Sequence, residues 1–231
     1  MELPQDMVNA IGTLGRSQMQ FVGDSYGNSG QGSARVKIIP IFARIDTLGR
    51  ASPNKVACRS GCDSCCHYHV YVTPLEVFSI VDEVKAWPFE RQTALLAAVQ
   101  RYVEKVKPMG KLRHVTMNIA CSFLKDGACT IYAMRPLACR RHHSADRSVC
   151  ERTFENPQSM EHAPKDKHRV VVSAALETLH AEYHRYRGFD RDSYEFQSAL
   201  LEAFTDPTSR KRWNAGKAAF QTVTDREPSR I

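Results

Sequence analysis

Four cysteines fall within nine positions of the stretch CRSGCDSCCHYHV, which covers residues 58–70. A second, more widely spaced group follows, and the two groups hold all eight cysteines of the 231-residue chain. The first group is Cys58, Cys62, Cys65 and Cys66, and the second is Cys121, Cys129, Cys139 and Cys150. Because isolated structural cysteines behave as small apolar residues and have no reason to gather, this clustering indicates that the thiols converge in the fold.

The choice between disulfides and metal ligands depends on the cellular compartment. The N-terminal segment MELPQDMVNAIG carries two acidic residues and lacks the apolar core of a secretory signal. No apolar run in the sequence approaches the roughly 20 residues that span a bilayer. We therefore expect a cytoplasmic protein without a membrane segment, in which thiols stay reduced. The even number of cysteines still permits disulfides, but metal ligands or redox groups are favoured.

The net charge of +7 indicates attraction to acidic partners, of which nucleic acid is the obvious example. The lysines and arginines are spread along the chain, however, and no recognisable nucleic-acid-binding motif accompanies them. We therefore expect a small molecule or a protein as the substrate or partner, with no specific binding of nucleic acid. A hydrophobic content of 42% is sufficient for a buried core, so the chain as a whole is not disordered.

Helical patterns surround the cysteine-rich centre. Apolar residues recur at helical spacing in residues 37–49, 74–87, 89–107 and 167–187. The second of these has a strong start signal, because Thr73 suits the N-cap, Pro74 the first helical turn and Glu76 a capping box. Two more helices are expected near the C-terminus, one from Asp192 or Ser193 to about Thr205, and one that begins at Asp206-Pro207 and contains Trp213 and Phe220.

Two segments differ from this helical pattern. Asp126-Gly127 separates two short apolar runs, which predicts a β-hairpin that brings Cys121 and Cys129 near each other. Residues 21–35 are rich in glycine, serine and asparagine, and we expect residues 1–35 to be a flexible N-terminal segment.

The expected fold is therefore mostly α, with helices around a central irregular, cysteine-rich, metal-binding core and a short β-hairpin. In this interpretation, residues 36–231 form a single helical domain with the cysteine-cluster core at residues 56–150.

The spacing of the first group favours an iron–sulfur cluster over zinc. Cys58-x3-Cys62-x2-Cys65 resembles the three-thiolate motif of radical S-adenosylmethionine enzymes, which holds a [4Fe–4S] cluster, although the β/α barrel of those enzymes is not indicated here. Structural zinc sites often use C-x2-C pairs, and only Cys62 and Cys65 have that spacing. Haem attachment requires C-x-x-C-H, but Cys66 follows Cys65. We predict an iron–sulfur cluster, with zinc as the alternative.

Charged residues and histidines near the cysteines are further candidates. Arg140 and Arg141, with His142 and His143, flank Cys139, and their charge is expected to stabilise a negatively charged cluster or to hold an anionic ligand. Arg135 and Arg140 are the predicted cofactor-binding residues, although Arg135 also suits a structural role as a buried donor that orients the backbone around Cys139. His67 follows the first group directly and is a candidate ligand. A further candidate set on one helix face is Glu177, His180 and His184, although a polar helix face also explains this pattern.

The segments CRSGCDSCCHYHVYVTPLE and CSFLKDGACTIYAMRPLACR resemble the YkgJ-type cysteine-cluster family, named for its CxxCxxCC motif, over about residues 56–150. This chain has three residues between its first two cysteines, so its form of the motif is CxxxCxxCC. The resemblance implies that all eight cysteines form a zinc- or iron-chelating set. It also places Arg135, Pro136 and Arg140 in the family's RP…CR segment.

Three functions are compatible with these patterns. The first is a metal-binding cysteine-cluster protein that holds an iron–sulfur cluster and has a redox, metal-handling or modifying role on an unknown substrate. The second is a [4Fe–4S]-dependent methyltransferase resembling the flagellin lysine N-methylases, although the sequence lacks a glycine-rich S-adenosylmethionine loop. The third is a zinc-stabilised protein-interaction module, in which zinc supplies folding energy. The sequence does not decide whether the protein is an enzyme or what its oligomeric state is.

Overall fold

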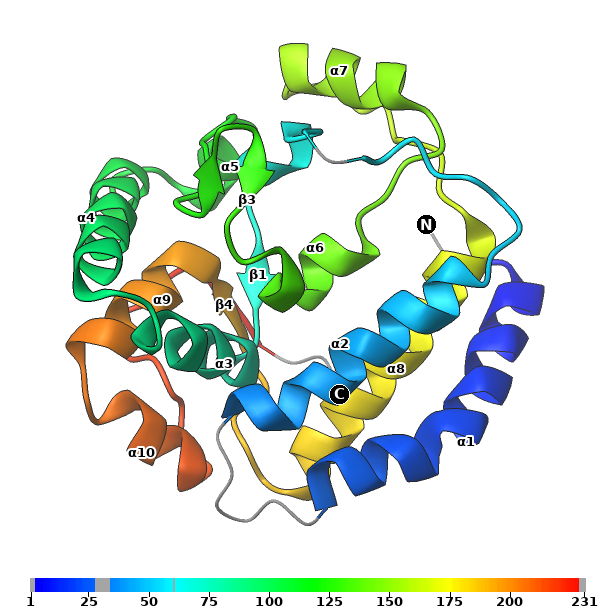
Figure 1. Ribbon diagram of the computed structural model, residues 1–231, viewed down its shortest axis with the longest axis horizontal. Coiled ribbons are helices and arrows are strands. Elements are labelled where there is room, and N and C mark those ends of the chain that lie inside the picture. Colours follow the sequence, from blue (N-terminus) through cyan, green and yellow to red (C-terminus); the bar gives the residue numbers. More distant parts are fainter. Residues whose placement is uncertain (1–2, 28–33, 60, 229–231) are drawn as a thin grey trace.

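The computed structural model describes residues 3–27, 34–59 and 61–228, and in this part of the chain it is mostly helical, as the sequence predicts (Figure 1). The α-helices are α1 (Gln5–Gly27), α2 (Ala34–Arg50), α3 (Pro74–Lys85), α4 (Phe89–Val106), α5 (Lys111–Val115), α6 (Leu137–Arg141), α7 (Arg147–Glu155), α8 (Lys167–Tyr186), α9 (Phe196–Thr205) and α10 (Ser209–Asn214). Two 3₁₀ turns, η1 (Ser64–His67) and η2 (Tyr132–Met134), lie in the irregular centre.

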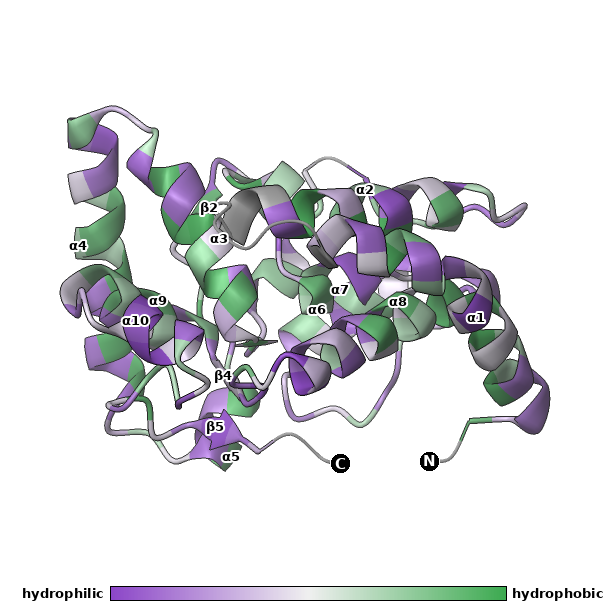
Figure 2. Ribbon diagram, turned by 90° about the horizontal axis from the view of Figure 1, so that it is seen from below, coloured by the Kyte–Doolittle hydropathy of each residue, from purple (hydrophilic) through white to green (hydrophobic). Residues whose placement is uncertain are grey.

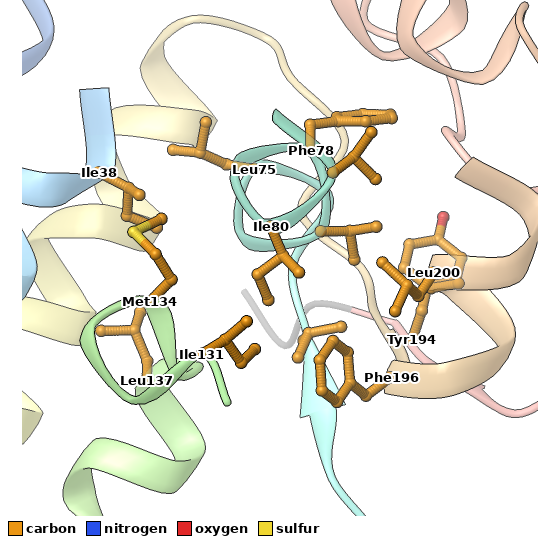
Figure 3. Packing of buried hydrophobic residues seen from close by; sticks show 14 of the residues in the cluster. Ile38, Leu75, Phe78, Ile80, Ile131, Met134, Leu137, Tyr194, Phe196 and Leu200 are labelled. Carbon is orange, nitrogen blue, oxygen red and sulfur yellow. The ribbon is translucent and has the colours of Figure 1, made fainter. Parts of the chain in front are cut away.

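The helices form two connected groups. On one side, α1 packs along α8, and α2 packs on both α8 and α3; on the other side, α9 packs against α3 and α4 (Figure 1). Helix α3 therefore lies between the groups, and most of its residues are buried. Figure 3 shows this arrangement: Ile38 lies on one side of the α3 residues Leu75 and Ile80, and Leu200 lies on the other. The apolar stripe of α3 is thus the centre of the hydrophobic core.

Short strands complete the fold. Strands β1 (Tyr71–Val72), β4 (Ser193–Glu195) and β5 (Arg226–Glu227) form an antiparallel sheet in the order β1-β4-β5. Strands β2 (Leu124–Lys125) and β3 (Ala128–Cys129) form the predicted hairpin. Its turn at Asp126-Gly127 has positive φ at both residues, 50° and 71°, as an Asp-Gly hairpin turn requires. Cys129 pairs with Leu124 in this register, and Cys121 precedes the hairpin.

The expectation of loose structure over residues 1–35 is wrong for α1. Met7, Leu14, Val22 and Tyr26 recur at intervals of four, seven or eight, so they share one helix face. Val22 and Tyr26 belong to the hydrophobic core, Leu14 packs against it, and α1 as a whole contacts α8. The glycines in this segment cost helix propensity, but burial of the stripe outweighs that cost. Residues 28–33 of the expected linker lie outside the described residues.

Two expectations near the C-terminus also need correction. Residues 193–195 form strand β4, and the helix begins only at Phe196, because the Glu195 carboxylate accepts hydrogen bonds from the Gln197 and Ser198 amides at its first turn. Helix α10 contains Trp213 as expected, but it ends at Asn214, and Phe220 is buried beyond it.

Polar and apolar residues are segregated along the helices, with polar residues prominent on the outer faces (Figure 2). Phe89, Leu112, Tyr132 and Tyr186 are large hydrophobic residues that remain exposed, so Tyr186 lies outside the buried stripe that the sequence predicts for α8. Across the described residues, no helix combines the length and the hydropathy that crossing a bilayer requires.

A buried polar chain connects four helices around Glu76. The Glu76 carboxylate, almost fully buried, accepts the Thr73 N–H and O–H, both at 2.8 Å, and the Leu137 N–H at 2.7 Å. Thr73 Oγ1 lies 3.5 Å from His180 Nε2 on α8, and the other nitrogen of that ring, Nδ1, lies 2.6 Å from the Tyr26 hydroxyl on α1. Because the Leu137 amide is at the N-terminus of α6, Glu76 joins the first turns of α3 and α6.

Substitution of Glu76 by glutamine tests this connection. We expect the variant to lose about 1–3 kcal/mol of unfolding free energy, because one carboxylate oxygen becomes an amide NH₂ that cannot accept a hydrogen bond. Urea unfolding followed by circular dichroism measures the change. The control is Glu155→Gln at an exposed position in the last turn of α7, which should change stability by less than about 0.5 kcal/mol. Equal stability of the two variants would contradict the structural role of Glu76.

Candidate metal centre

The cysteines come from several short elements that lie in the upper half of the view in Figure 1. Cys58 and Cys62 lie in the loop before η1, and η1 contains Cys65 and Cys66. The second group is distributed over the hairpin, α6 and α7: Cys121 precedes β2, Cys129 lies in β3, Cys139 in α6 and Cys150 in α7. All eight are free thiols.

Backbone hydrogen bonds bring the two groups together. The Cys121 N–H donates to the Cys66 carbonyl at 2.9 Å, which ties the hairpin to the end of the first group. On the other side, the Ala57 N–H donates to the Ser144 carbonyl at 2.8 Å, and the Ser144 N–H donates to Cys58 Sγ at 3.4 Å. The first loop is therefore held between the hairpin and the segment after α6.

The thiol of Cys65 affects the pKa of cysteines in both groups. Burial raises the pKa of Cys58, Cys62, Cys129 and Cys139, and the nearby Cys65 thiol raises the pKa of all four further. Hydrogen bonding to Cys66 and burial raise the pKa of Cys65 itself. Cys65 therefore lies within electrostatic range of thiols from both groups.

Burial also determines the protonation state of these ligands. It raises the pKa of Cys121 and Cys139 to about 12, and neighbouring thiols add to the effect. At neutral pH and without a compensating cation, these two residues are protonated thiols. Because thiolates are the metal-binding form, metal binding here must release protons and is favoured by rising pH.

Arg135 places a positive charge beside the thiols. Its charge lowers the pKa of Cys58, Cys65, Cys129 and Cys139, against the larger effects of burial. The guanidinium lies over the Tyr132 ring at 3.9 Å and 3.7 Å from Asp46 Oδ1, while its buried Nε has no hydrogen-bond partner in the structure. A cation with an unused donor next to thiols fits a site for a negatively charged metal–thiolate group.

The guanidinium of Arg140 is bonded to other parts of the fold. Its guanidinium pairs with Asp46 Oδ2 at 2.5 Å, donates to the Ala133 carbonyl, and donates through Nε to the Arg135 carbonyl at 3.1 Å. It also lies 4.1 Å from the centre of the Phe42 ring. These contacts attach the η2–α6 segment to α2. Cofactor binding by Arg140 stays a prediction, and its observed contacts are structural.

The other histidine candidates near the cysteines have structural contacts. His67 Nδ1 lies 3.1 Å from the Asp63 carbonyl, and its ring packs against Phe154. Burial lowers the pKa of His142 to about 4, so it carries no charge at neutral pH. His143 accepts the Asp166 N–H and lies 2.8 Å from the Arg141 carbonyl, so both of its ring nitrogens have protein partners.

The candidate set on α8 also has structural contacts. His180 contacts Tyr26 and Thr73, its ring centre lies 4.2 Å from that of His184, and Glu177 pairs with Arg141 at 3.2 Å. Sequence reasoning missed Gln197, whose Nε2 donates to Cys121 Sγ at 3.3 Å. No local pattern could reveal Gln197, because 76 positions separate the two residues.

Comparison with known families agrees with this geometry. The model of the family described as "CxxCxxCC: Putative zinc- or iron-chelating domain" matches residues 57–165, a segment that contains all eight cysteines. This match covers a little less than half of the 231-residue chain. The resemblance seen in the motifs is thereby confirmed, and the CxxCxxCC domain supports metal binding by the cysteine cluster. The searches of curated proteins and of solved structures returned no significant match.

Replacing Arg140 by lysine separates its structural role from cofactor binding. We expect Arg140→Lys to lose about 2–3 kcal/mol of unfolding free energy even in protein stripped of metal by a chelator, because lysine cannot make the same set of charged hydrogen bonds. Arg91→Lys, in which the exposed guanidinium lies over Trp87, is the control and should cost about 0.5 kcal/mol or less. If Arg140→Lys is destabilising only in metal-loaded protein, the structural role is wrong.

Proposed function

We propose that the CxxCxxCC domain of this protein holds an iron–sulfur cluster, [4Fe–4S] in type, and that the cluster serves a redox, metal-handling or modifying role on an unknown substrate. The single observation that carries this proposal is the hydrogen bond from the Cys121 N–H to the Cys66 carbonyl, which brings the second cysteine group against the first. Cys65 belongs to the three-thiolate spacing of the first group and lies within electrostatic range of Cys129 and Cys139 in the second. One polynuclear centre can use thiolates from both groups.

The separation of the sulfurs favours a cluster over a single zinc ion. Tetrahedral zinc with Zn–S bonds of about 2.3 Å places its sulfurs only about 3.8 Å apart. Within the described residues, no three cysteine sulfurs lie within 4.8 Å of one another. Thiolates on different irons of a cluster are spaced by the bridging sulfides, so they do not need to meet around one ion.

The surroundings of the thiols suit a cluster of net negative charge. Arg135 supplies positive charge, and the amide of Gln197 and the backbone N–H of Ser144 donate to Cys121 and Cys58. Such hydrogen bonds and charges set the reduction potential of a cluster. When bound, the cluster would supply one-electron chemistry or an open iron for a substrate, while these residues of the chain hold and tune it.

Metal analysis after anaerobic purification tests the proposal. We expect iron and acid-labile sulfide in similar amounts and a broad visible absorption, and we expect Cys65→Ser to lose most of both. Ser122→Ala is the matched control, because it removes a buried hydroxyl that has no hydrogen-bond partner in the structure, next to Cys121. A colourless protein with stoichiometric zinc would overturn the iron–sulfur proposal and favour a zinc-stabilised interaction module.

The charge of Arg135 leads to a prediction for the reduction potential. Because reduction makes a cluster more negative, we expect Arg135→Gln to lower the potential by tens of millivolts. Redox titration monitored by electron paramagnetic resonance measures the shift. The control Arg101→Gln, at an exposed position of α4, should leave the potential unchanged. A potential that is unchanged or raised in Arg135→Gln would show that Arg135 does not act on the cluster.

The same proposal extends to location and partners. Free thiols and an iron–sulfur cluster suit the reducing cytoplasm. A small molecule or a protein is the substrate we infer. Methyl transfer, as in the flagellin lysine N-methylases, remains the alternative activity. Calorimetry with S-adenosylmethionine distinguishes it, since measurable binding would support methyl transfer and its absence would remove most of that support.

A further inference from the structure

One group of possible metal ligands lies apart from the cysteines. Within the described residues, His69, His114 and Asp225 each offer a ligand atom, and these atoms all lie within 4.8 Å of one another. Asp225 lies outside the segment that matches the CxxCxxCC family model, and the proposed cysteine centre uses none of the three. The group combines two imidazoles with one carboxylate, a set of donors that suits iron and zinc.

The small sheet and α5 bring these residues together. His69 precedes β1, and Asp225 precedes β5; the two strands flank β4 in the sheet. The Glu195 N–H donates to the Asp225 carbonyl at 2.9 Å, which fixes the position of Asp225. His114 comes from α5, which lies beside β5 (Figure 2) and is joined to it by the ion pair between Lys111 and Glu227 at 2.6 Å.

The distances between the ligand atoms fit a single ion. His69 Nε2 lies 2.8 Å from Asp225 Oδ2, and His114 Nδ1 lies 3.9 Å from the same oxygen. Ligand atoms bound at about 2.0–2.2 Å lie roughly 3–3.5 Å apart around one metal ion, so the two observed separations bracket the required value. The two imidazole rings are nearly perpendicular, with centres 4.5 Å apart, which lets both direct a nitrogen to a common point beside Asp225.

Hydrogen bonds occupy the other atom of two of these groups. The Tyr102 hydroxyl lies 2.9 Å from His114 Nε2, and the Tyr71 hydroxyl donates to Asp225 Oδ1 at 2.6 Å. These bonds leave His114 Nδ1 and Asp225 Oδ2 directed at each other and at His69. Metal-binding histidines and carboxylates are usually oriented by such outer partners. An ordinary His–Asp hydrogen bond accounts for His69, but it does not explain why His114 Nδ1 faces the same oxygen at 3.9 Å.

The site borders a cavity. His114 and Asp225 line a cavity of about 490 Å³ between α4, α5, α9 and the C-terminal segment. The side chains of His114 and His69 are themselves almost fully buried. A metal ion held by three protein ligands on one side and open to a cavity on the other has positions left for water or substrate. Lys111, the cation near Tyr71, is paired with Glu227 and therefore adds little repulsion.

We propose that His69, His114 and Asp225 form a second metal site, separate from the cysteine centre, that binds a divalent transition-metal ion such as Zn²⁺ or Fe²⁺ with its open face toward this cavity. The ligand atoms are His69 Nε2, His114 Nδ1 and Asp225 Oδ2. Tyr102 and Tyr71 are positioning residues that orient His114 and Asp225.

Cobalt binding tests this site without depending on the identity of the cysteine metal. The full chain, purified anaerobically with its cysteine centre loaded, is titrated with Co²⁺, and bound cobalt and the visible spectrum are measured. We expect one cobalt ion per chain whose spectrum lacks the intense thiolate-to-cobalt band. His114→Ala and Asp225→Asn should abolish this binding, and Tyr102→Phe should weaken it about 10-fold. His162→Ala, at an exposed histidine, is the control and should bind as the wild type does.

A second variant and two measurements keep the test informative if one variant does not fold. Asp225→Asn keeps the shape of the side chain and its acceptor for Tyr71, so it serves if His114→Ala does not fold. Circular dichroism and the metal content of the cysteine centre report on the fold of each variant. If folded Asp225→Asn binds cobalt as tightly as the wild type, or if the cobalt lost in the variants carries the thiolate band, the second site is overturned. Either result leaves the iron–sulfur proposal unaffected.

Discussion

The arrangement of the helices depends on the hydrogen bonds that the buried Glu76 carboxylate accepts. A buried carboxylate is costly unless several donors satisfy it, and Glu76 receives three from Thr73 and Leu137. Two of these donors belong to its own helix start and one belongs to α6, which lies 61 residues away in the sequence. The same threonine contacts His180 on α8, and His180 contacts Tyr26 on α1. One satisfied polar group therefore fixes four helices in the middle of an apolar core.

Helix α6 shows why this matters for the cysteine centre. With five residues, it is too short to be stable alone, so its geometry must come from tertiary contacts. Glu76 holds its first amide, and the pairing of Arg140 with Asp46 holds its other end against α2. Cys139 lies between these two attachments. Its thiol is thus presented by the rigid core, whereas Cys58 and Cys62 come from an irregular loop.

The parts of the fold that the sequence predicts well are those with local signals. Helix α3 begins where Thr73 and Glu76 form a cap, and the hairpin turns at Asp126-Gly127, because in both cases nearby residues determine the backbone. Helix α1 was missed because its glycines and serines obscured a stripe that only packing against α8 stabilises. Strand β4 was missed for a similar reason, since two or three residues become a strand only when β1 and β5 lie on either side.

The same distinction applies to the site. The cysteines can be recognised in the sequence because a thiol is a metal ligand wherever it lies in the fold, and their spacing indicates that they act together. Gln197 and Asp225 are ordinary polar residues until the fold places one beside Cys121 and the other beside His69. Their positions depend on strand pairing between residues more than 100 positions apart, which no local pattern contains.

The segments that flank β1 and β4 connect the cysteine centre to the histidine–aspartate group. Cys66 accepts the Cys121 amide, and three positions later His69 contacts Asp225. At the end of β4, the Glu195 N–H donates to the Asp225 carbonyl, and two positions later, in α9, the Gln197 side chain donates to Cys121 Sγ. The segment before β1 and the segment from β4 into α9 thus each contact both groups, and the Phe196 N–H donates to the Val70 carbonyl at 3.0 Å between them. Because β1 and β4 pair in one register, the same two strands support the segments that reach both groups.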